Sequence, residues 1–512
     1  MERRRTRTND EDVGLVGVSC IADLAWDHLE PRVAAEKPAA DSVDAAQGLG
    51  TVTDVDAHLG VVRHEPDRRL AIARIQQLEE RIHGVDGSHG PQCTRHHSTM
   101  PSVLARHWRL DPAVTFLNHG SFGACPGPVL DVQREWQDRL EAEPVRFLAR
   151  ELDGHLAASR AALGEFIGAN PDDLAFVTNA TGAVNAVVRS LSFSPGDEIL
   201  TTDHEYNAVL NVLGDVAKRD GASVVVVRLP FPGRSADDVV ERVLAAVTAR
   251  TRLAVISHVT SPTALVLPVE QLIPAIAERG IDTLVDGAHA PGMLPLDVDR
   301  LGAAYYAGNL HKWVCAPKGA AFLHVRRDRQ PGVRPGTISH GANSPLGARS
   351  RFRLEFDWQG TLDPTAWLSV PAALTFIGGL VEGGWPGVMA RTHGLALEAR
   401  EALTNVLGGA RAGATPDAML GSMIAMAMPE GGPLGGPPMA DQSSPLDADP
   451  LQTVLFDRYG IELPIVGWPV PAVRSTEQIQ RVLRVSTALY NDADDIKRLV
   501  AALNELDGSG QV

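Results

Sequence analysis

Two short segments place ionisable side chains directly after apolar runs, where a folded chain could use them for chemistry. In TLVDGAHAPG, Asp286 ends such a run and His289 follows three residues later, and a carboxylate there is costly to bury unless a cation pairs with it. In YYAGNLHKWVCAPKG, Lys312 lies between His311 and Trp313. Among apolar neighbours its amine loses solvation, which lowers its pKa and makes it a usable nucleophile or base. The structural alternatives are a helix cap for Asp286 and a surface position beside Trp313 for Lys312.

A third segment, FVTNATGAVNAVV, leads from a predicted strand into a helix through Thr178–Gly182. Small residues at a helix start leave backbone N–H groups free, and Thr181 adds a hydroxyl, so this turn predicts a phosphate site; a simple helix cap is the alternative. A phosphate site, an aspartate and a lysine 26 residues beyond it match the needs of pyridoxal phosphate, whose Schiff base, ring nitrogen and phosphate they would hold. The chain has neither a Walker loop nor a G-x-G-x-x-G dinucleotide fingerprint.

A parallel sheet would position these side chains, because such sheets bind ligands at the carboxyl ends of their strands. From residue 101 onward, apolar β-branched runs alternate with helical patterns. This alternation predicts an α/β fold with a mainly parallel, doubly wound sheet that is covered on both faces. The predicted strands are 174–178, 198–202, 223–229, 253–258, 283–286, 303–307 and 320–325, and the helices between them include 182–191, 207–219, 236–249 and 269–279.

The domain prediction separates a large domain from a smaller one. Residues 100–362 would form an N-terminal arm and the large domain, and residues 363–512 would form a smaller α+β domain of long helices and a few strands, among them 423–428 and 481–486. Within the smaller domain, the stretch 429–450 is rich in Gly, Pro, Ser and Asp and is predicted to be a mobile loop.

The first 99 residues differ in composition from the rest of the chain. They contain one aromatic residue, Trp26, out of 25 in the whole chain, and are predicted to be a mostly disordered extension with one helix around 67–82. We predict no metal site, because a solvated polar tail explains this region better than metal binding by the candidate ligands Cys93, His96 and His97.

Composition narrows the function further. With 512 residues, 44% of them hydrophobic and 21% charged, the chain is of ordinary globular type, which excludes disordered, collagen-like and disulfide-scaffold proteins. The net charge of −16 argues against binding to nucleic acid or to an anionic membrane, so an anionic ligand needs a local site. Four cysteines without a C-x-x-C spacing predict a reduced, cytoplasmic protein, and no apolar run is long enough for a membrane span.

Several ordered motifs together resemble the class V aminotransferase family of fold-type I pyridoxal-phosphate enzymes, and within it the isopenicillin N epimerase-like branch. The resemblance extends from about Thr115 to Leu506. The motifs that carry it are FLNHGSFGACPGPV, TNATGAVN, TTDHEYNAV, SHVTSPTALVLPV, VDGAHAPG, GNLHKW, WQGTLDPTA and RVSTALYN. One departure is Ala264, which stands where relatives usually have glycine and matters only if the backbone there needs a positive φ.

The resemblance implies roles for the residues around the cofactor ring. Lys312 would be the Schiff-base lysine, and Asp286 would face the pyridine nitrogen. His289 would hold the side of the ring that carries the 3-oxygen, where Ser261 would contact the phenolic oxygen. Tyr206 would stack on the ring, with a core tyrosine as the alternative.

The resemblance also implies residues for the phosphate and the substrate. Ala180 and Thr181 would bind the phosphate, and His311 would contact the cofactor. Thr361 would reach a phosphate across the interface of a homodimer, so that each active site needs two subunits. Arg484 would bind the substrate carboxylate, with a surface salt bridge as the alternative. The substrate entrance would be lined by Asn118 and His119.

The expected reaction starts from an amino acid or a modified cysteine. Epimerisation and C–S bond cleavage are both expected from the branch, and the residues do not separate them; transamination and a binding or regulatory protein without turnover are the alternatives. Cysteine desulfurases of the same family need a cysteine in their C-terminal part, and this chain has none beyond Cys315, which is predicted to be a packed core thiol. We therefore do not expect chemistry of the persulfide type.

Overall fold

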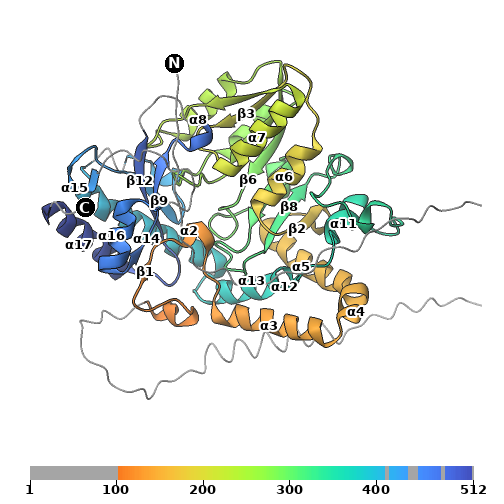
Figure 1. Cartoon of the computed structure of the whole chain (residues 1–512), viewed down its shortest axis with the longest axis horizontal. Coiled ribbons are helices and arrows are strands. Elements are labelled where there is room, and N and C mark those ends of the chain that lie inside the picture. Colours follow the sequence, from red (N-terminus) through yellow and green to blue (C-terminus); the bar gives the residue numbers. More distant parts are fainter. Residues whose placement is uncertain (1–101, 410–413, 436–447, 474–478, 510–512) are drawn as a thin grey trace, which may run out of the picture. The chain divides into compact units, whose positions relative to one another are not determined.

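The computed structural model describes residues 102–409, 414–435, 448–473 and 479–509 (Figure 1). Its large sheet has seven strands in the order β2-β8-β7-β6-β5-β3-β4. The strands from β7 to β4 in that order run parallel, whereas β8 is antiparallel to both neighbours. The predicted fold class is therefore confirmed. The strands are β2 (Leu174–Val177), β3 (Glu198–Thr202), β4 (Ser223–Val227), β5 (Thr251–Ser257), β6 (Asp282–Asp286), β7 (Tyr305–Asn309) and β8 (Ala321–Val325).

Both faces of this sheet are apolar, because alternate residues of a strand point to opposite faces. On β3, Leu200 belongs to one apolar cluster and Ile199 to the other, and on β5 Ile256 and Val255 divide in the same way. Helices cover both faces, as the sequence predicts for a doubly wound sheet. One face is covered by α6 (Ala180–Ser190) and α7 (Asn207–Asp220), and the other by α5 (Leu152–Ile167), α8 (Ala236–Ala245), α9 (Val269–Ala277) and α13 (Val370–Gly379).

A second sheet of three antiparallel strands, in the order β11-β12-β9, is formed by the C-terminal part of the chain. Its apolar face packs against long helices, with Leu483, Leu403 and Leu499 in one cluster. The strands are β9 (Met423–Ala427), β11 (Ile465–Trp468) and β12 (Gln480–Ser486), and the helices are α14 (Gly384–Val406), α16 (Pro450–Tyr459) and α17 (Ala493–Ser509).

The segment before the large sheet joins this C-terminal part. Strand β1 (Thr115–Phe116) pairs in parallel with β10 (Ile461–Glu462), and Asn118 forms a bridge with Ser486 of β12. Helix α2 (His119–Phe122) follows directly, so it is held beside β12 (Figure 1). Trp367 and Phe376, by contrast, follow residue 363 but pack into a core of the large sheet.

The other helices are short or peripheral.

No single helix among the described residues is long and apolar enough to cross a membrane. The bent pair 365–379 and 384–406 would be long and apolar enough only when its two parts are taken together. The predictions for residues 1–99 and for most of the loop 429–450 lie outside the described residues. The remaining helices are α3 (Gly127–Ala142), α4 (Pro144–Arg146), α10 (Val298–Leu301), α11 (Arg351–Asp357), α12 (Thr365–Leu368) and α15 (Gly432–Gly435), with a π-helix at Phe147–Glu151 and 3-10 turns at Val103–His107, Pro171–Asp173, Gln330–Gly332, His340–Ala342, Asp417–Met419 and Pro471–Val473.

Candidate active site

Four neighbouring strands bring polar side chains to one edge of the large sheet. Glu205 follows β3, Ser257 ends β5, Asp286 ends β6, and Lys312 comes three residues after β7. Because these strands are parallel and adjacent, their carboxyl ends share one edge. The edge therefore combines two residues predicted from the sequence, Asp286 and Lys312, with two that were not predicted, Glu205 and Ser257.

The amine of Lys312 lies inside this edge, 3.0 Å from Nε2 of His289. Loss of solvation, and after it the charge of Arg484, lowers the pKa of Lys312 to about 7, although the charge of Asp286 opposes this shift. A lysine with such a pKa offers a neutral amine near neutral pH, which is what a nucleophile or a base needs.

His289 is a neutral ring whose tautomer is set by its other neighbour. The indole N–H of Trp313 donates to His289 Nδ1 at 3.4 Å, so the ring proton belongs on Nε2, from which it is donated to the Lys312 amine. Burial lowers the pKa of His289 well below its ordinary value, and the charges of Lys312 and Arg484 add to the shift. Gly292 allows this approach, because a Cβ at that position, where φ is +85°, would lie 2.6 Å from a backbone carbon of Trp313.

Two carboxyl groups are buried at the same edge. Asp286 accepts one hydrogen bond, from the N–H of Ala288 to Oδ1 at 3.0 Å. Burial raises the pKa of Asp286, against the opposing effects of the Ala288 bond and the Lys312 charge. Burial, and after it the charge of Asp286, raises the pKa of Glu205 to about 8. The site therefore contains a pair of carboxyl groups that disfavour each other's ionisation.

Tyr206 stands at the mouth of the same site, directly before α7. Its side chain is 37% exposed, which rules out the core-tyrosine alternative. Burial of the remaining part and the charge of Asp286 raise the pKa of Tyr206, whereas the charge of Arg484 opposes this shift. Tyr206 is thus close enough to Asp286 and Arg484 to feel both charges, a placement that suits an aromatic cover for a ligand ring.

Arg484 reaches the site from β12 of the second sheet. Its Nη1 donates to the carbonyl of Ser261 at 2.6 Å and to the Ser261 hydroxyl at 3.3 Å, and its Nη2 donates to the Ser121 hydroxyl at 2.7 Å. The side chain is buried, its Nε has no partner, and none of the carboxylates in the described ranges pairs with it. The surface-salt-bridge alternative is therefore wrong. A buried guanidinium without an anion is costly, which favours an anionic ligand at this position.

The turn that carries Ser261 shows why residue 264 matters. Ala264 has a φ of +55°, a conformation that glycine adopts without strain and alanine does not. The turn is closed by a hydrogen bond from the N–H of Ala264 to the carbonyl of Thr260. Ala264 therefore adopts a strained backbone conformation in the turn that carries Ser261. The Ser261 hydroxyl contacts Arg484, and its contact with the phenolic oxygen of the cofactor stays a prediction.

The α2 segment supports the site from outside the sheet. His119 is buried, and its Nε2 lies 3.0 Å from the Lys312 carbonyl while its Nδ1 lies 2.7 Å from the Tyr490 hydroxyl. Ser121 receives the bond from Arg484 and donates to Oδ1 of Asn118 at 2.6 Å. In this structure, His119 and Asn118 position Lys312 and Ser121, and their predicted place at a substrate entrance stays a prediction.

The start of α6 matches the predicted phosphate site in part. Asn179 caps the helix by accepting from the N–H of Gly182 at 2.8 Å, and Oδ1 of Asn309 accepts from the N–H of Ala180 at 2.8 Å. Neither the N–H nor the hydroxyl of Thr181 has a partner among the described residues, and this turn is open to solvent. His311, another residue predicted to bind the cofactor, uses Nδ1 to contact the carbonyl of Ala320 at 3.0 Å.

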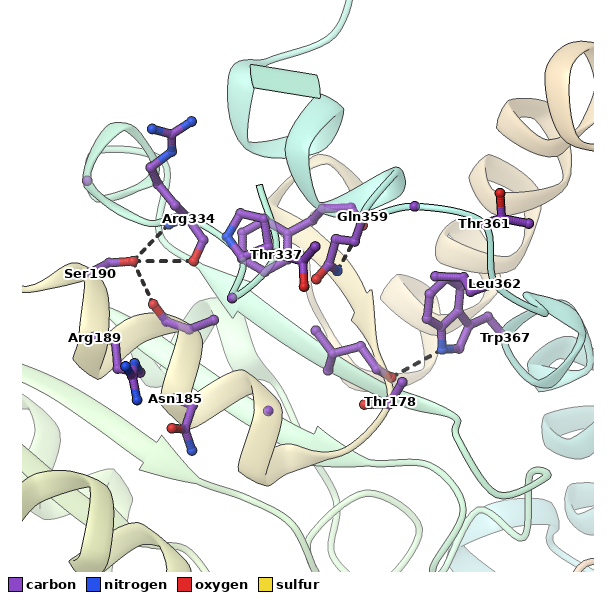
Figure 2. A pocket seen from close by; sticks show the side chains of 18 of the residues that line it. Thr178, Asn185, Arg189, Ser190, Arg334, Thr337, Gln359, Thr361, Leu362 and Trp367 are labelled. Atoms are coloured by element: carbon purple, nitrogen blue, oxygen red, sulfur yellow. Dashed lines mark hydrogen bonds between the residues drawn. The ribbon is translucent and has the colours of Figure 1, made fainter. Parts of the chain in front are cut away.

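Thr361 is the residue predicted to reach a phosphate across a dimer interface. It lies on the loop after α11, with Thr178 on the wall of a hollow of about 670 Å³ that also includes Gly182. Figure 2 shows its side chain turned away from Thr178, with Leu362 and Trp367 drawn between them. The contact of Thr361 with a phosphate across a homodimer interface stays a prediction.

Comparisons with known proteins identify a family and similar chains. A family model, aminotransferase class-V, matches residues 125–499. The chain is 39% identical over 409 residues to isopenicillin N epimerase of Amycolatopsis lactamdurans, covering 78% of this chain and 96% of that protein. It is 33% identical over 428 residues to a probable chloroplastic L-cysteine desulfhydrase of Arabidopsis thaliana, covering 81% and 86%. The solved cysteine desulfurase CsdA of Escherichia coli shares the fold, with a TM-score of 0.62 at 21% identity over 79% of this chain and 97% of that one.

Proposed function

Because the chain belongs to the class-V aminotransferase family, we propose that it is an enzyme acting at the α or β carbon of an amino acid or a modified cysteine, as an epimerase or a C–S lyase. The family resemblance seen in the sequence is confirmed. The cofactor of this family is pyridoxal 5′-phosphate. The choice of reaction and substrate is the proposal.

The residues present suit this cofactor. Lys312 offers a desolvated amine for the aldehyde, Asp286 a buried carboxylate for the ring nitrogen, and Thr181 an unpartnered N–H and hydroxyl for the phosphate. Tyr206 is partly exposed beside Asp286 and would cover the ring. The buried and unpartnered Nε of Arg484 marks the place for an anion from the substrate. Each group that the cofactor and an amino acid need thus has a counterpart in one site.

Each residue then has a defined task. When bound, the cofactor withdraws electrons from the α-carbon of the substrate, which makes its proton acidic. Lys312 removes or returns that proton, since a pKa of about 7 lets its amine do both near neutral pH. Arg484 binds the substrate carboxylate through its planar guanidinium group, and Ser121 and Ser261 orient that group by accepting hydrogen bonds from it. The neutral His289 keeps the free amine oriented before attachment.

One observation carries the proposal: Lys312 and Arg484 are both desolvated in one site, and neither forms an ion pair with a carboxylate within the described ranges. A buried guanidinium without an anion costs stability, and a desolvated amine beside it is a ready nucleophile, so a ligand that supplies a carboxylate and an aldehyde is favoured here. The similarity to both an epimerase and a desulfhydrase favours chemistry that begins at Cα–H.

An assay in deuterated water tests the proposal. The holoenzyme is incubated with D- and L-amino acids and with cysteine conjugates, and Lys312→Ala serves as the inactive control. Deuterium at Cα with inverted configuration identifies an epimerase. Release of a thiol or sulfide together with pyruvate and ammonia identifies a C–S lyase. A new keto acid with transfer of the amino group to the cofactor would instead identify the alternative, an aminotransferase.

A persulfide mechanism is not part of the proposal. The thiol of Cys315 is buried, and burial raises its pKa above its ordinary range, which suits a packed thiol rather than a nucleophile. The other alternative is a binding or regulatory protein that retains the fold. Colourless protein after addition of pyridoxal phosphate would favour that alternative over an enzyme, whereas a yellow protein that loses its colour in Lys312→Ala would oppose it.

We also propose that the protein is a cytoplasmic homodimer with shared active sites and binds neither nucleic acid nor membranes. The support for the dimer is Thr361, to which the family resemblance assigns a contact across the interface and which is exposed on a loop (Figure 2). A partner subunit would bring its own Thr361 to the start of α6. Sedimentation of the holoenzyme tests the oligomeric state, and a monomer at assay concentration would contradict shared sites.

A further inference from the structure

Glu205 is a buried carboxyl group of the active-site edge to which the proposed chemistry assigns no task. It is fully buried in the turn between β3 and α7. Strand β5 lies between β3 and β6, and Ser257 of β5 is the cross-strand partner of Asp286. The Ser257 hydroxyl donates to Oε1 of Glu205 at 2.7 Å. Ser257 therefore links Glu205 to the strand position of Asp286.

The two oxygens of Glu205 have unequal surroundings. Oε1 accepts from the Ser257 hydroxyl and from the N–H of Tyr206 at 2.8 Å. Oε2 is buried and has no partner among the described residues. A charged carboxylate would leave half of its charge there without a donor, which is expensive in a buried site. A neutral acid fits better, with Oε1 as the carbonyl oxygen and Oε2 as the hydroxyl that has a proton to donate.

The surrounding charges agree with a neutral acid. Burial is the main reason why the pKa of Glu205 rises to about 8, and the charge of Asp286 adds to it. The hydrogen bonds from Ser257 and Tyr206 act in the other direction without overcoming burial. The other ionisable groups near this turn have contacts of their own: His204 contacts Thr263, Asp203 accepts from the N–H of Leu229, and His258 contacts Tyr306. Lys312 contacts His289, and Arg484 donates to Ser261.

We propose that Glu205 is a neutral carboxylic acid in the holoenzyme and a positioning residue for Asp286, to whose carboxylate its Oε2 hydroxyl donates. Two neighbouring buried carboxyl groups do not both ionise readily, so a neutral Glu205 leaves the charge on Asp286. Asp286 is then the partner of the ring nitrogen, a task that rests on the proposed function. Glu205 does not touch the substrate. It keeps the negative charge on Asp286, the carboxylate that contacts the ring nitrogen.

Four holoenzyme variants test this assignment: Glu205→Gln, Glu205→Leu, Glu198→Gln and Ser257→Ala. Glu205→Gln keeps the shape, an acceptor for Ser257 and a donor in place of the hydroxyl, whereas Glu205→Leu keeps only the volume. Glu198→Gln is the matched control: Glu198 lies at the other end of β3, is also buried, and has a pKa lowered by the hydrogen bond from Thr248 and by Arg250. The readouts are the infrared band of a protonated carboxyl group and the dissociation constant of pyridoxal phosphate between about pH 6 and about pH 10.

The wild-type spectrum minus that of Glu205→Gln should show a protonated-carboxyl band at neutral pH that fades as the pH rises through the pKa of Glu205. The control difference with Glu198→Gln should show no such band. The cofactor affinity of Glu205→Gln should match that of the wild type within about threefold at neutral pH, whereas Glu205→Leu should lose about tenfold to a hundredfold, the worth of a hydrogen bond to a charged group. Ser257→Ala removes a bond that lowers the pKa of Glu205, so the band should persist to higher pH.

Absence of the band at neutral pH would overturn the proposal, and so would a Glu205→Gln variant as impaired as Glu205→Leu. Should Glu205→Gln fail to fold, the comparison of wild type with Ser257→Ala decides, because an ionised Glu205 would show no band in either protein. The infrared band does not depend on the cofactor. Failure of the wild type to bind pyridoxal phosphate at all would therefore refute the proposed function separately from this assignment.

Discussion

Lys312→Met in the cofactor-free protein tests the electrostatics of the active site without any turnover. Burial lowers the pKa of Lys312 from its ordinary 10.5 to about 7. Between these two values the folded protein binds one proton fewer than the unfolded chain, so the stability of the wild type must rise with pH across that window. Below about pH 7 both states hold the proton, and the buried charge has its full destabilising effect.

The size of the effect follows from the shift. A lowering from 10.5 to about 7, at about 1.4 kcal/mol for each pKa unit, corresponds to about 5 kcal/mol. The Lys312 side chain keeps partial contact with solvent, which screens its charge, so we expect about 3 kcal/mol. Methionine has a similar length and no charge. The variant should therefore be more stable than the wild type by about 3 kcal/mol at about pH 7, and this advantage should fall below about 1 kcal/mol by about pH 10.

Urea unfolding of the two proteins after removal of the cofactor, followed by tryptophan fluorescence, measures this difference. Lys497→Met is the control, since Lys497 is 75% exposed and pairs with Asp494 at the surface. That pairing raises the pKa of Lys497, so Lys497→Met should change the stability equally at about pH 7 and about pH 10. A stability difference between Lys312→Met and the wild type that does not depend on pH would refute the reasoning, because the amine would then be solvated in the folded protein.

Four further outcomes are expected. Arg484→Ala should raise KM for amino-acid substrates roughly tenfold to a hundredfold, the loss of a charge-assisted bond, and an unchanged KM would move the carboxylate site elsewhere. Ser121→Ala, which only loosens Arg484, should raise KM about fivefold in steady-state assays and leave kcat unchanged; a fall in kcat alone would contradict this role. Asp286→Asn should retain cofactor, as measured by absorbance, but lower kcat at least about a hundredfold, and near-normal turnover would show that the ring nitrogen has another partner. Mixed dimers of Lys312→Ala and Thr361→Ala chains should regain one intact site, whereas activity that is merely the sum of the two homodimers would exclude shared sites.

The strands of the large sheet could be predicted closely because each is a short apolar run that ends in polar or turn-forming residues. The prediction for 198–202 coincides with β3, and 283–286 differs from β6 by one residue. The antiparallel direction of β8 could not be predicted, because its sequence is as apolar as that of its parallel neighbours. The pairing of β1 with β10 joins segments more than 300 residues apart and left no local signal.

Candidate site residues could be predicted when the residue type and its neighbours alone indicate the chemistry. Residues whose role depends on a contact between distant segments could not be predicted. Lys312 and Asp286 stand out by charge beside apolar residues, whereas Arg484 was predicted only from the family resemblance of its motif. Glu205 is surrounded by polar residues in TTDHEYNAV, and only the fold brings it to Ser257, 52 positions later. The same holds for Ser121, whose role depends on Arg484. A carboxyl residue inside a strand-to-helix turn is the one signal in the sequence that could have drawn attention to Glu205.

The bridge between Asn118 and Ser486 ties the segment before residue 125 to the C-terminal sheet, so a functional fragment of this protein must include that segment. The family model begins at residue 125, yet His119 and Ser121, which hold the Lys312 carbonyl and Arg484, precede it. A gene trimmed to the family boundaries would encode the whole large sheet and still lack both supports. Any swap of modules between members of this branch should therefore keep the stretch from Thr115 to Phe122 together with β10 and β12, since these pieces come from opposite ends of the gene but form one structural unit.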